Sequence, residues 1–341
     1  MFYALNGWRF IFALMIVWHH MLVAKPLNAD FGNPIVTFFF VLSGFLLTLS
    51  YRDKLLDGRV SSRDFIIKRS VTIFPLQWLF TILFVICSIN VKTYWAIPFH
   101  LTLTQSLIPL WEVNFTLNTP SWFLSSIFVC YLLTPVIFIF TRNRNIYLLL
   151  FIAAVVIWHA FLHFLPDYIG RRWLCYINPL ARLQDYGMGI LLALYWNDIQ
   201  SMLKKVFYNR FLHTLLEVVV AFLICVALFR FPILGVERHL GIGSVLLDCF
   251  ICLFVASFSM GQGLISNLLS LPVFSNLGKI SITIFMSHGF VLFWAKPLYD
   301  TSVGMYAIVV FVATMLLSFL LERYYCAYMK HWLLGVLNKK A

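Results

Sequence analysis

Charged residues are scarce in this sequence of 341 residues. Asp, Glu, Lys and Arg make up 11% of it, against about 25% in soluble domains. A soluble protein of this size could not bury the 62% of residues that are hydrophobic, and the same composition excludes intrinsic disorder. The seven cysteines are scattered through apolar runs, which excludes a secreted disulfide scaffold. A polytopic membrane protein remains.

Acidic residues are fewer than basic ones, 13 against 25, so the formal net charge is +12. The basic residues are spread over many loops rather than gathered in one patch. This distribution is typical of the cytoplasmic loops of membrane proteins and not of a nucleic-acid-binding surface. We therefore expect the lipid bilayer, and no nucleic acid, as a partner. Nothing in the sequence defines an oligomeric state.

Long apolar runs are abundant, and a transmembrane helix needs about 20 such residues. We predict an all-α bundle of about ten transmembrane helices around an internal cavity, because helices are the spanning form that such runs allow. The chain forms one integral-membrane domain, residues 1–341, without a soluble domain. Most loop Lys and Arg fall on the side of the amino terminus, which predicts both termini in the cytoplasm. The predicted spans are residues 8–25, 34–51, 71–90, 120–141, 146–165, 180–197, 213–230, 241–260, 277–297 and 303–325.

The first span carries ionisable residues, which are costly inside a membrane. Arg9 and His20 share one helix face and lie about 16 Å apart along the axis, whereas His19 points about 80° away. An arginine near the inner surface can hold a phosphorylated ligand, and a deeper imidazole can act as a base. The alternative is an interfacial arginine and a histidine bonded to a neighbouring helix. Spacing alone leaves both open.

The next two spans contain further candidates. Gly44 in the second span permits close helix packing, and Ser43 can form a hydrogen bond across the interface. A nucleophilic Ser43 is disfavoured because no base lies beside it in sequence. Lys68 and Arg69 precede the third span, where they can bind phosphate groups or simply set the topology.

Polar residues also occur in later spans. Arg182 and Asp185 lie three residues apart on one helix face, so we expect them to pair. Glu217 and Asp248 can serve as proton-relay groups, which would favour a transporter. His288 either lines an acceptor cavity or is a packed, hydrogen-bonded histidine. No metal is expected, because His159 and His163 suit a metal pair by spacing but no third ligand accompanies them.

Six motifs in a fixed order resemble the acyltransferase-3 family of integral-membrane acyltransferases over nearly the whole chain. The most specific features are the spacing of Arg9 and His20 and the aromatic run that leads to Ser43-Gly44-Phe45. The motifs are Leu5-Asn6-Gly7-Trp8-Arg9 with His20, Phe38–Phe45, Lys68-Arg69 with Pro75, Pro120-Ser121-Trp122-Phe123-Leu124-Ser125 with Tyr131 and Pro135, Arg182-Leu183 with Gly187 and Gly189, and Leu277-Gly278-Lys279-Ile280-Ser281 with His288.

The resemblance implies a role for each matching position. Arg9 and His20 correspond to the functional pair of the family's first helix. The other matches are the basic Lys68 and Arg69, the aromatic Trp122 and Tyr131, and the acidic Glu322. Two positions depart from the family pattern: Thr72 stands where members often have a second arginine, and Ile127 where many have a glutamate.

The resemblance implies an O-acyltransferase that moves an acyl group, most often acetyl, from cytoplasmic acetyl-CoA to a hydroxyl of a cell-surface or lipid-linked carbohydrate. A bacterial inner membrane follows from the same resemblance. Arg9, Lys68 and Arg69 would hold the phosphates, and His20 would deprotonate the acceptor or carry the acyl group transiently. Ser43, Trp122, Tyr131, Arg182 and His288 would line the substrate cavity. The rival hypothesis is a transporter or flippase for a lipid-linked sugar.

Overall fold

The computed structural model describes residues 2–21, 32–164, 173–230 and 242–338, and every regular element within them is a helix. Each predicted span coincides with a helix, although residues 22–25, 165 and 241 of the predicted ranges lie outside the described residues. The all-α class of an integral membrane protein is therefore confirmed. The helices are α1 Tyr3–His20, α2 Gly32–Leu56, α3 Ser62–Ile86, α6 Ser121–Phe140, α7 Arg144–Phe164, α8 Pro179–Leu194, α10 Arg210–Arg230, α11 Ile242–Met260, α14 Ser281–Thr301 and α15 Val303–Leu320.

Not all ten helices have the length and composition of a membrane span. Seven do in the described part of the chain, and α14 together with the bent helix α13 before it gives an eighth. The other two are α1, which carries Arg9, and α8, which has 16 residues and carries Arg182 and Asp185. Polar side chains inside the bundle thus make both helices hard to recognise by hydropathy alone.

Shorter helices connect the spans, and two predicted boundaries were wrong. The predicted span 277–297 is broken between α13 and α14 by a bend of 63°. The predicted span 303–325 continues through a π-helical turn, Leu321–Cys326, into α16. The connecting elements are α4 Ile97–Thr102, α5 Trp111–Asn114, α9 Trp196–Val206, α12 Leu264–Leu269, α13 Pro272–Lys279 and α16 Ala327–Asn338, with short turns at Tyr94–Ala96, Gln105–Leu107 and Trp173–Ile177.

Side-chain caps fix where helices α3 and α8 begin. Ser61 Oγ accepts a hydrogen bond from the Asp64 backbone N–H (3.0 Å) at the start of α3. Asn178 Oδ1 accepts one from the Leu180 N–H (2.9 Å) at the start of α8, where Pro179 takes the first helical position. Such caps satisfy backbone donors that the helix itself leaves unpaired.

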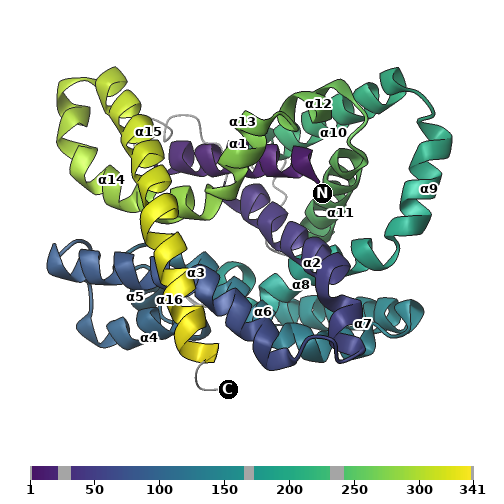
Figure 1. Ribbon diagram of the computed structural model, residues 1–341, viewed down its shortest axis with the longest axis horizontal. Coiled ribbons are helices and arrows are strands. Elements are labelled where there is room, and N and C mark those ends of the chain that lie inside the picture. The colour runs from purple at the N-terminus through teal and green to yellow at the C-terminus, as the bar shows by residue number, and fades with distance from the viewer. Residues whose placement is uncertain (1, 22–31, 165–172, 231–241, 339–341) are drawn as a thin grey trace.

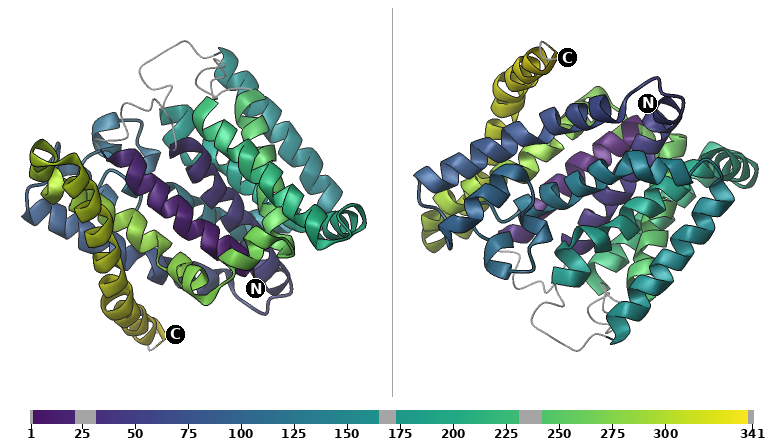
Figure 2. Two further views of the ribbon diagram at one scale, coloured as in Figure 1. Left: turned by 90° about the horizontal axis from the view of Figure 1, so that it is seen from above. Right: turned by 90° about the horizontal axis from the view of Figure 1, so that it is seen from below.

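Helix α1 lies in the middle of the bundle, between α14–α15 on one side and α10–α11 on the other (Figures 1 and 2). On one face, the Phe12 ring lies 4.7 Å from that of Phe38 on α2 and 5.7 Å from that of Phe254 on α11. On the opposite face, Val17 packs in a cluster with Ile284 of α14. The helix that carries Arg9 and His20 is therefore enclosed on both sides.

Helices α2 and α8 approach each other to backbone contact. A Cβ at Gly44 would lie 2.1 Å from the Tyr186 carbonyl oxygen, and one at Gly189 would lie 2.0 Å from the Val41 oxygen. Only glycine fits at either position, as small-residue packing between membrane helices requires. The predicted packing role of Gly44 is thus confirmed.

The segment between α3 and α6 is held by buried polar groups. Trp95 and Trp111 are exposed on this segment, whereas His100 is fully buried. Its Nε2 donates to the Val113 carbonyl oxygen (2.8 Å), and its Nδ1 accepts from Ser121 Oγ (3.3 Å). Burial lowers the pKa of His100 from its usual 6.5 to about 4, so the folded segment holds this histidine neutral.

Candidate functional site

One cavity of about 280 Å³ contains a predicted basic residue from α1 and another from α3. Arg9 and Arg69 both line it, together with Ser43 of α2 and Tyr131 of α6. Apolar side chains from α2, α3, α6 and α14 form the rest of its wall. We call it the arginine cavity. It unites four of the residues that the sequence singled out from four different spans.

The two guanidinium groups have no carboxylate bound to them. Among the described residues, Arg9 makes neither a hydrogen bond nor an ion pair, although Glu322 and Tyr131 act on it electrostatically. Arg69 Nη2 donates to the Tyr51 hydroxyl (3.3 Å), and its buried Nε has no partner in the described structure. Free guanidinium donors are suited to bind phosphate. The arginine cavity therefore has the chemistry of an anion site.

Glu322 lies in the π-helical turn that follows α15, near the arginine cavity. Its Oε2 accepts a hydrogen bond from Thr283 Oγ1 of α14 at 2.7 Å. In the same turn, the Tyr325 hydroxyl donates to the Pro75 carbonyl oxygen of α3 at 3.0 Å. π-helical turns of this kind are often found at functional sites. The turn joins two walls of the arginine cavity and keeps one negative charge near Arg9.

A second cavity, of about 360 Å³, contains His20 at the other end of α1. His288 and Gly289 of α14 line it, as do Asn118 and Lys296. We call it the histidine cavity. The rise of an α-helix places Arg9 and His20 about 16 Å apart, so α1 presents one functional group to each cavity.

The hydrogen bonds of His20 fix its tautomer. Its Nδ1 lies 2.9 Å from the Ile16 carbonyl oxygen, which can only accept, so Nδ1 carries the proton and Nε2 keeps its lone pair. His288 follows the same pattern, with Nδ1 3.3 Å from the Ile284 oxygen. The His288 Nε2 then accepts from His20 Nδ1 at 3.2 Å. The neutral His20 thus offers Nε2 as a base or nucleophile.

Aromatic rings lie between the two cavities. Phe39 and Phe123 line the arginine cavity, with ring centroids 6.0 Å apart. Phe123 packs on Phe285 of α14 at 5.0 Å, and Phe285 lies 6.0 Å from the ring of His288. We call these three phenylalanines the aromatic partition. The three rings form a continuous series of contacts from the arginine cavity to His288.

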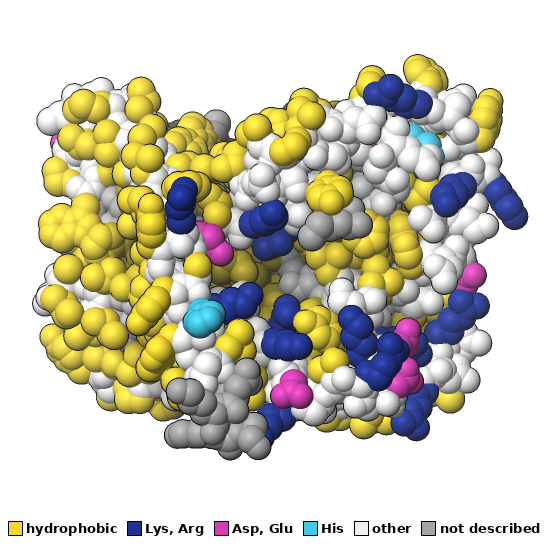
Figure 3. Space-filling view, viewed as in Figure 1, with side chains coloured by type: hydrophobic (Ala, Val, Ile, Leu, Met, Phe, Trp, Pro, Cys, Tyr) yellow, Lys and Arg dark blue, Asp and Glu magenta, His cyan; other side chains and the backbone are white. Residues whose placement is uncertain are grey.

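Basic side chains gather on one face of the molecule. Figure 3 shows Lys and Arg gathered around a hollow at the centre of one face and along its right side. Lys68 is exposed and does not line the arginine cavity, unlike its neighbour Arg69. Its predicted contact with phosphate therefore stays a prediction, one that would apply outside this cavity.

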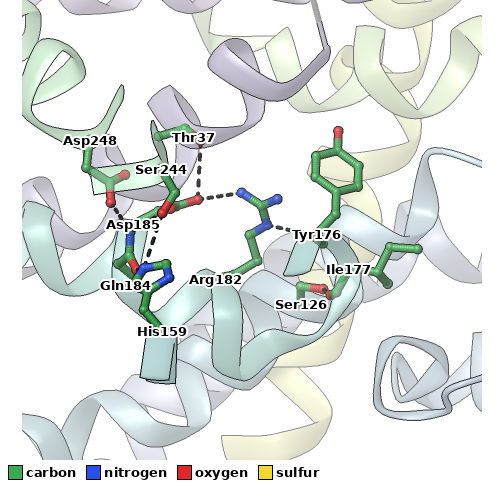
Figure 4. Close-up of polar contacts among 10 residues, drawn as sticks. All are labelled: Thr37, Ser126, His159, Tyr176, Ile177, Arg182, Gln184, Asp185, Ser244 and Asp248. Atoms are coloured by element: carbon green, nitrogen blue, oxygen red, sulfur yellow. Dashed lines mark hydrogen bonds and ion pairs between the residues drawn. The ribbon is translucent and has the colours of Figure 1, made fainter. Parts of the chain in front are cut away.

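Arg182 belongs to a separate polar cluster, drawn in Figure 4. The predicted pair forms: Arg182 Nη1 lies 2.6 Å from Asp185 Oδ2, and both side chains are buried. Gln184 bonds to His159 (2.8 Å) and to Asp248 (2.7 Å), so the cluster joins α7, α8 and α11. Arg182 and Trp122 line neither the arginine cavity nor the histidine cavity.

A family model described as an acyltransferase domain, that of acyltransferase-3, matches residues 2–323. The chain belongs to the acyltransferase-3 family. It is therefore a membrane acyltransferase. No curated protein and no solved structure matches the chain.

The two departures from the acyltransferase-3 pattern lie close together in space. Thr72 and Ile127 both line the arginine cavity. Replacing an arginine and a glutamate by a threonine and an isoleucine removes one positive and one negative charge, so the balance of charge in the cavity is kept. The effect is a less polar wall near Arg69.

Glu217, a residue on which the transporter hypothesis depended, has a structural task. The buried carboxylate accepts hydrogen bonds from the backbone N–H groups of Gly263 (3.0 Å), Ile265 (3.0 Å) and Ser266 (3.1 Å). These are donors at the start of α12, where a carboxylate is favoured. Glu217 therefore caps a helix.

Sequence reasoning missed several residues that line the cavities. Asn118 and Lys296 lie in the histidine cavity, and Phe285 completes the aromatic partition. Asn118 was recognisable only as a polar residue two positions before the Pro120 motif. The contact between His288 and His20 was not predicted, although His288 itself was.

Proposed function

We propose that this protein transfers an acyl group, most simply acetyl, from cytoplasmic acyl-CoA to a hydroxyl of a cell-surface or lipid-linked carbohydrate. The observation that carries the proposal is the position of two cavities along α1. One contains two guanidinium groups with no carboxylate bound to them among the described residues, and the other contains an imidazole whose tautomer is fixed by its hydrogen bonds. The amino-terminal side, where the basic loops lie, then faces the cytoplasm of a bacterial inner membrane.

Arg9 and Arg69 bind the phosphates of the donor in the arginine cavity. The aromatic partition, Phe39, Phe123 and Phe285, guides the extended pantetheine arm toward His20, so that the thioester lies in the histidine cavity. A phosphate-binding end and a reacting end on one helix account for the separation of Arg9 and His20. Holding the donor at both ends converts a bimolecular encounter into an oriented one.

His20 then acts through Nε2 by one of two routes. As a general base, Nε2 takes the proton of the acceptor hydroxyl while its oxygen attacks the thioester carbonyl; the thiolate leaves and receives that proton. As a nucleophile, Nε2 attacks the thioester and the thiolate leaves; the acceptor hydroxyl then attacks the acyl-imidazole, which releases neutral His20, and the hydroxyl proton passes to the CoA thiolate. In both routes a positive charge develops on the ring, and the acceptors at Ile16 and His288 stabilise it through Nδ1–H.

The test uses the full chain in nanodiscs with radiolabelled acetyl-CoA and a glycan acceptor. We expect wild type to release CoA and label the acceptor, and His20→Ala to lose at least about 100-fold of this rate, the lower part of the range for general-base catalysis. His163→Ala is the matched control, because His163 is an exposed histidine on α7 outside both cavities. A folded His20→Ala protein with wild-type turnover would refute the proposal.

A further inference from the structure

The histidine cavity contains a lysine whose charge is not balanced by a neighbour. Lys296 of α14 lines the cavity and is exposed. Within the described chain it makes neither a hydrogen bond nor an ion pair, even though Asp300 stands one turn further along the same helix. A lysine ammonium group donates up to three hydrogen bonds and accepts none. Lys296 therefore offers a positive charge and free donors to a ligand in this cavity.

The same face of α14 carries Lys296 and the contact to His20. His288, Leu292 and Lys296 are spaced four residues apart and all line the cavity, as residues on one face of a helix do. His288 lies 3.2 Å from His20 through its Nε2. Two turns of helix, about 12 Å along the axis, separate His288 from Lys296. The ammonium group and the proposed reacting imidazole thus belong to one cavity but lie at different points along its wall.

The rest of the wall strengthens the effect of this charge. Phe84, Leu117, Leu292 and Phe293 contribute apolar side chains, and no Asp or Glu lines the cavity in the described part of the chain. A cleft with apolar walls and charge of one sign concentrates the electrostatic potential and attracts ligands of the opposite sign. The histidine cavity is therefore suited to a ligand that carries a negative charge.

We propose that the acyl acceptor is an anionic saccharide, whose phosphate or carboxylate group binds to Lys296 while one of its hydroxyls reacts at His20. Two helix turns between these points favour an acceptor whose anion and reacting hydroxyl are on different sugar residues. Lys296 is then a residue that determines acceptor specificity, because a neutral saccharide leaves its ammonium group without a partner. This inference rests on the proposed function, since it assigns the class of the acceptor.

The experiment compares pairs of disaccharides that differ in one anionic group. Trehalose 6-phosphate is compared with trehalose, and cellobiouronate with cellobiose, so that the phosphate and the carboxylate are tested separately. Binding to the full chain in nanodiscs of phosphatidylcholine is measured by saturation-transfer NMR without acetyl-CoA. We expect wild type to bind at least one anionic member at least about 3-fold more tightly than its neutral partner, as an exposed ion pair allows.

Three variants complete the test. Lys296→Gln removes the charge and should reduce the preference to about 1, whereas Lys296→Arg keeps the charge and should retain it. Lys92→Gln is the matched control, because Lys92 is an exposed lysine that does not line the histidine cavity, and it should behave as wild type. Raising the salt from about 0.1 M to about 1 M shortens the Debye length from about 10 Å to about 3 Å, so the preference of wild type should decrease.

The outcomes separate this inference from the proposed function. A wild type without a preference for either anionic disaccharide, as expected if Lys296 contacts only lipid headgroups, would overturn the inference. A preference that persists in Lys296→Gln would overturn it as well. Acyl transfer to neutral and anionic saccharides at equal kcat/KM would support the proposed function and refute the role of Lys296. Charge-selective binding in a protein that never consumes acetyl-CoA would instead overturn the proposed acyl transfer.

Discussion

The contact between His288 and His20 makes a quantitative prediction about turnover. His288 Nε2 accepts from His20 Nδ1 at 3.2 Å. When Nε2 of His20 takes a proton or an acyl group, the ring becomes positively charged and this hydrogen bond becomes charge-assisted. Such bonds contribute about 1.5–3 kcal/mol. Removing the acceptor should therefore lower kcat by about 10- to 150-fold.

Two substitutions distinguish positioning from packing. His288→Leu removes the accepting nitrogen, whereas His288→Gln keeps an acceptor oxygen close to the position of Nε2. We expect the leucine variant to show the full loss in kcat and the glutamine variant to stay within about 10-fold of wild type. The KM for acyl-CoA should change little in either, because Arg9 and Arg69, the residues proposed to bind the donor, line the other cavity.

The assay is steady-state release of CoA from protein in nanodiscs, with thermal unfolding measured on each variant. A merely structural His288 would lower stability in both variants and would show no recovery with glutamine. If folded His288→Leu turns over at the wild-type rate, the reasoning from the hydrogen-bond geometry is refuted.

Two other predictions concern donor binding and pH. Arg69→Gln should raise the KM for acyl-CoA by about 10- to 150-fold, because a charged hydrogen bond to phosphate is lost. Arg63 is exposed on the same helix, so Arg63→Gln should leave the KM unchanged. Equal KM values for the two variants in steady-state kinetics would contradict this prediction. Burial lowers the pKa of His100 from 6.5 to about 4, so the unfolded chain binds a proton at this histidine before the folded protein does. The free energy of unfolding should therefore decrease as the pH drops from about 6.5 to about 4, by up to about 3 kcal/mol, and this effect should level off below about pH 4. Thermal unfolding between pH 4 and 7 should show this loss in wild type and a flatter profile in His100→Gln, and identical profiles would count against it.

Most of the long helices were predictable because they are apolar runs long enough to cross a bilayer. The shared face of Arg9 and His20 followed from helical periodicity, and the structure brings Arg9 together with Arg69 as phosphate binding would require. Local sequence carries this information, since it depends only on spacing within one helix.

Features that arise between helices were not predictable in this way. The bend of 63° before Ser281 lets α14 approach α1 and brings His288 to His20, yet nothing in the predicted span 277–297 marks it except Gly278. The aromatic partition draws one ring from each of α2, α6 and α14. Each of these depends on long-range packing.

The central position of α1 has a consequence for how the protein is made. Helix α1 is synthesised first, but one of its faces is covered by α14, and α15 contributes to the same cluster. The ribosome must therefore release most of the chain into the membrane before His20 meets His288. Until then, Arg9 and His20 lack the neighbours that they have in the folded protein. The proposed catalytic centre is therefore completed last, by the carboxyl-terminal third of the polypeptide, and a chain that ends before α14 contains His20 but not His288.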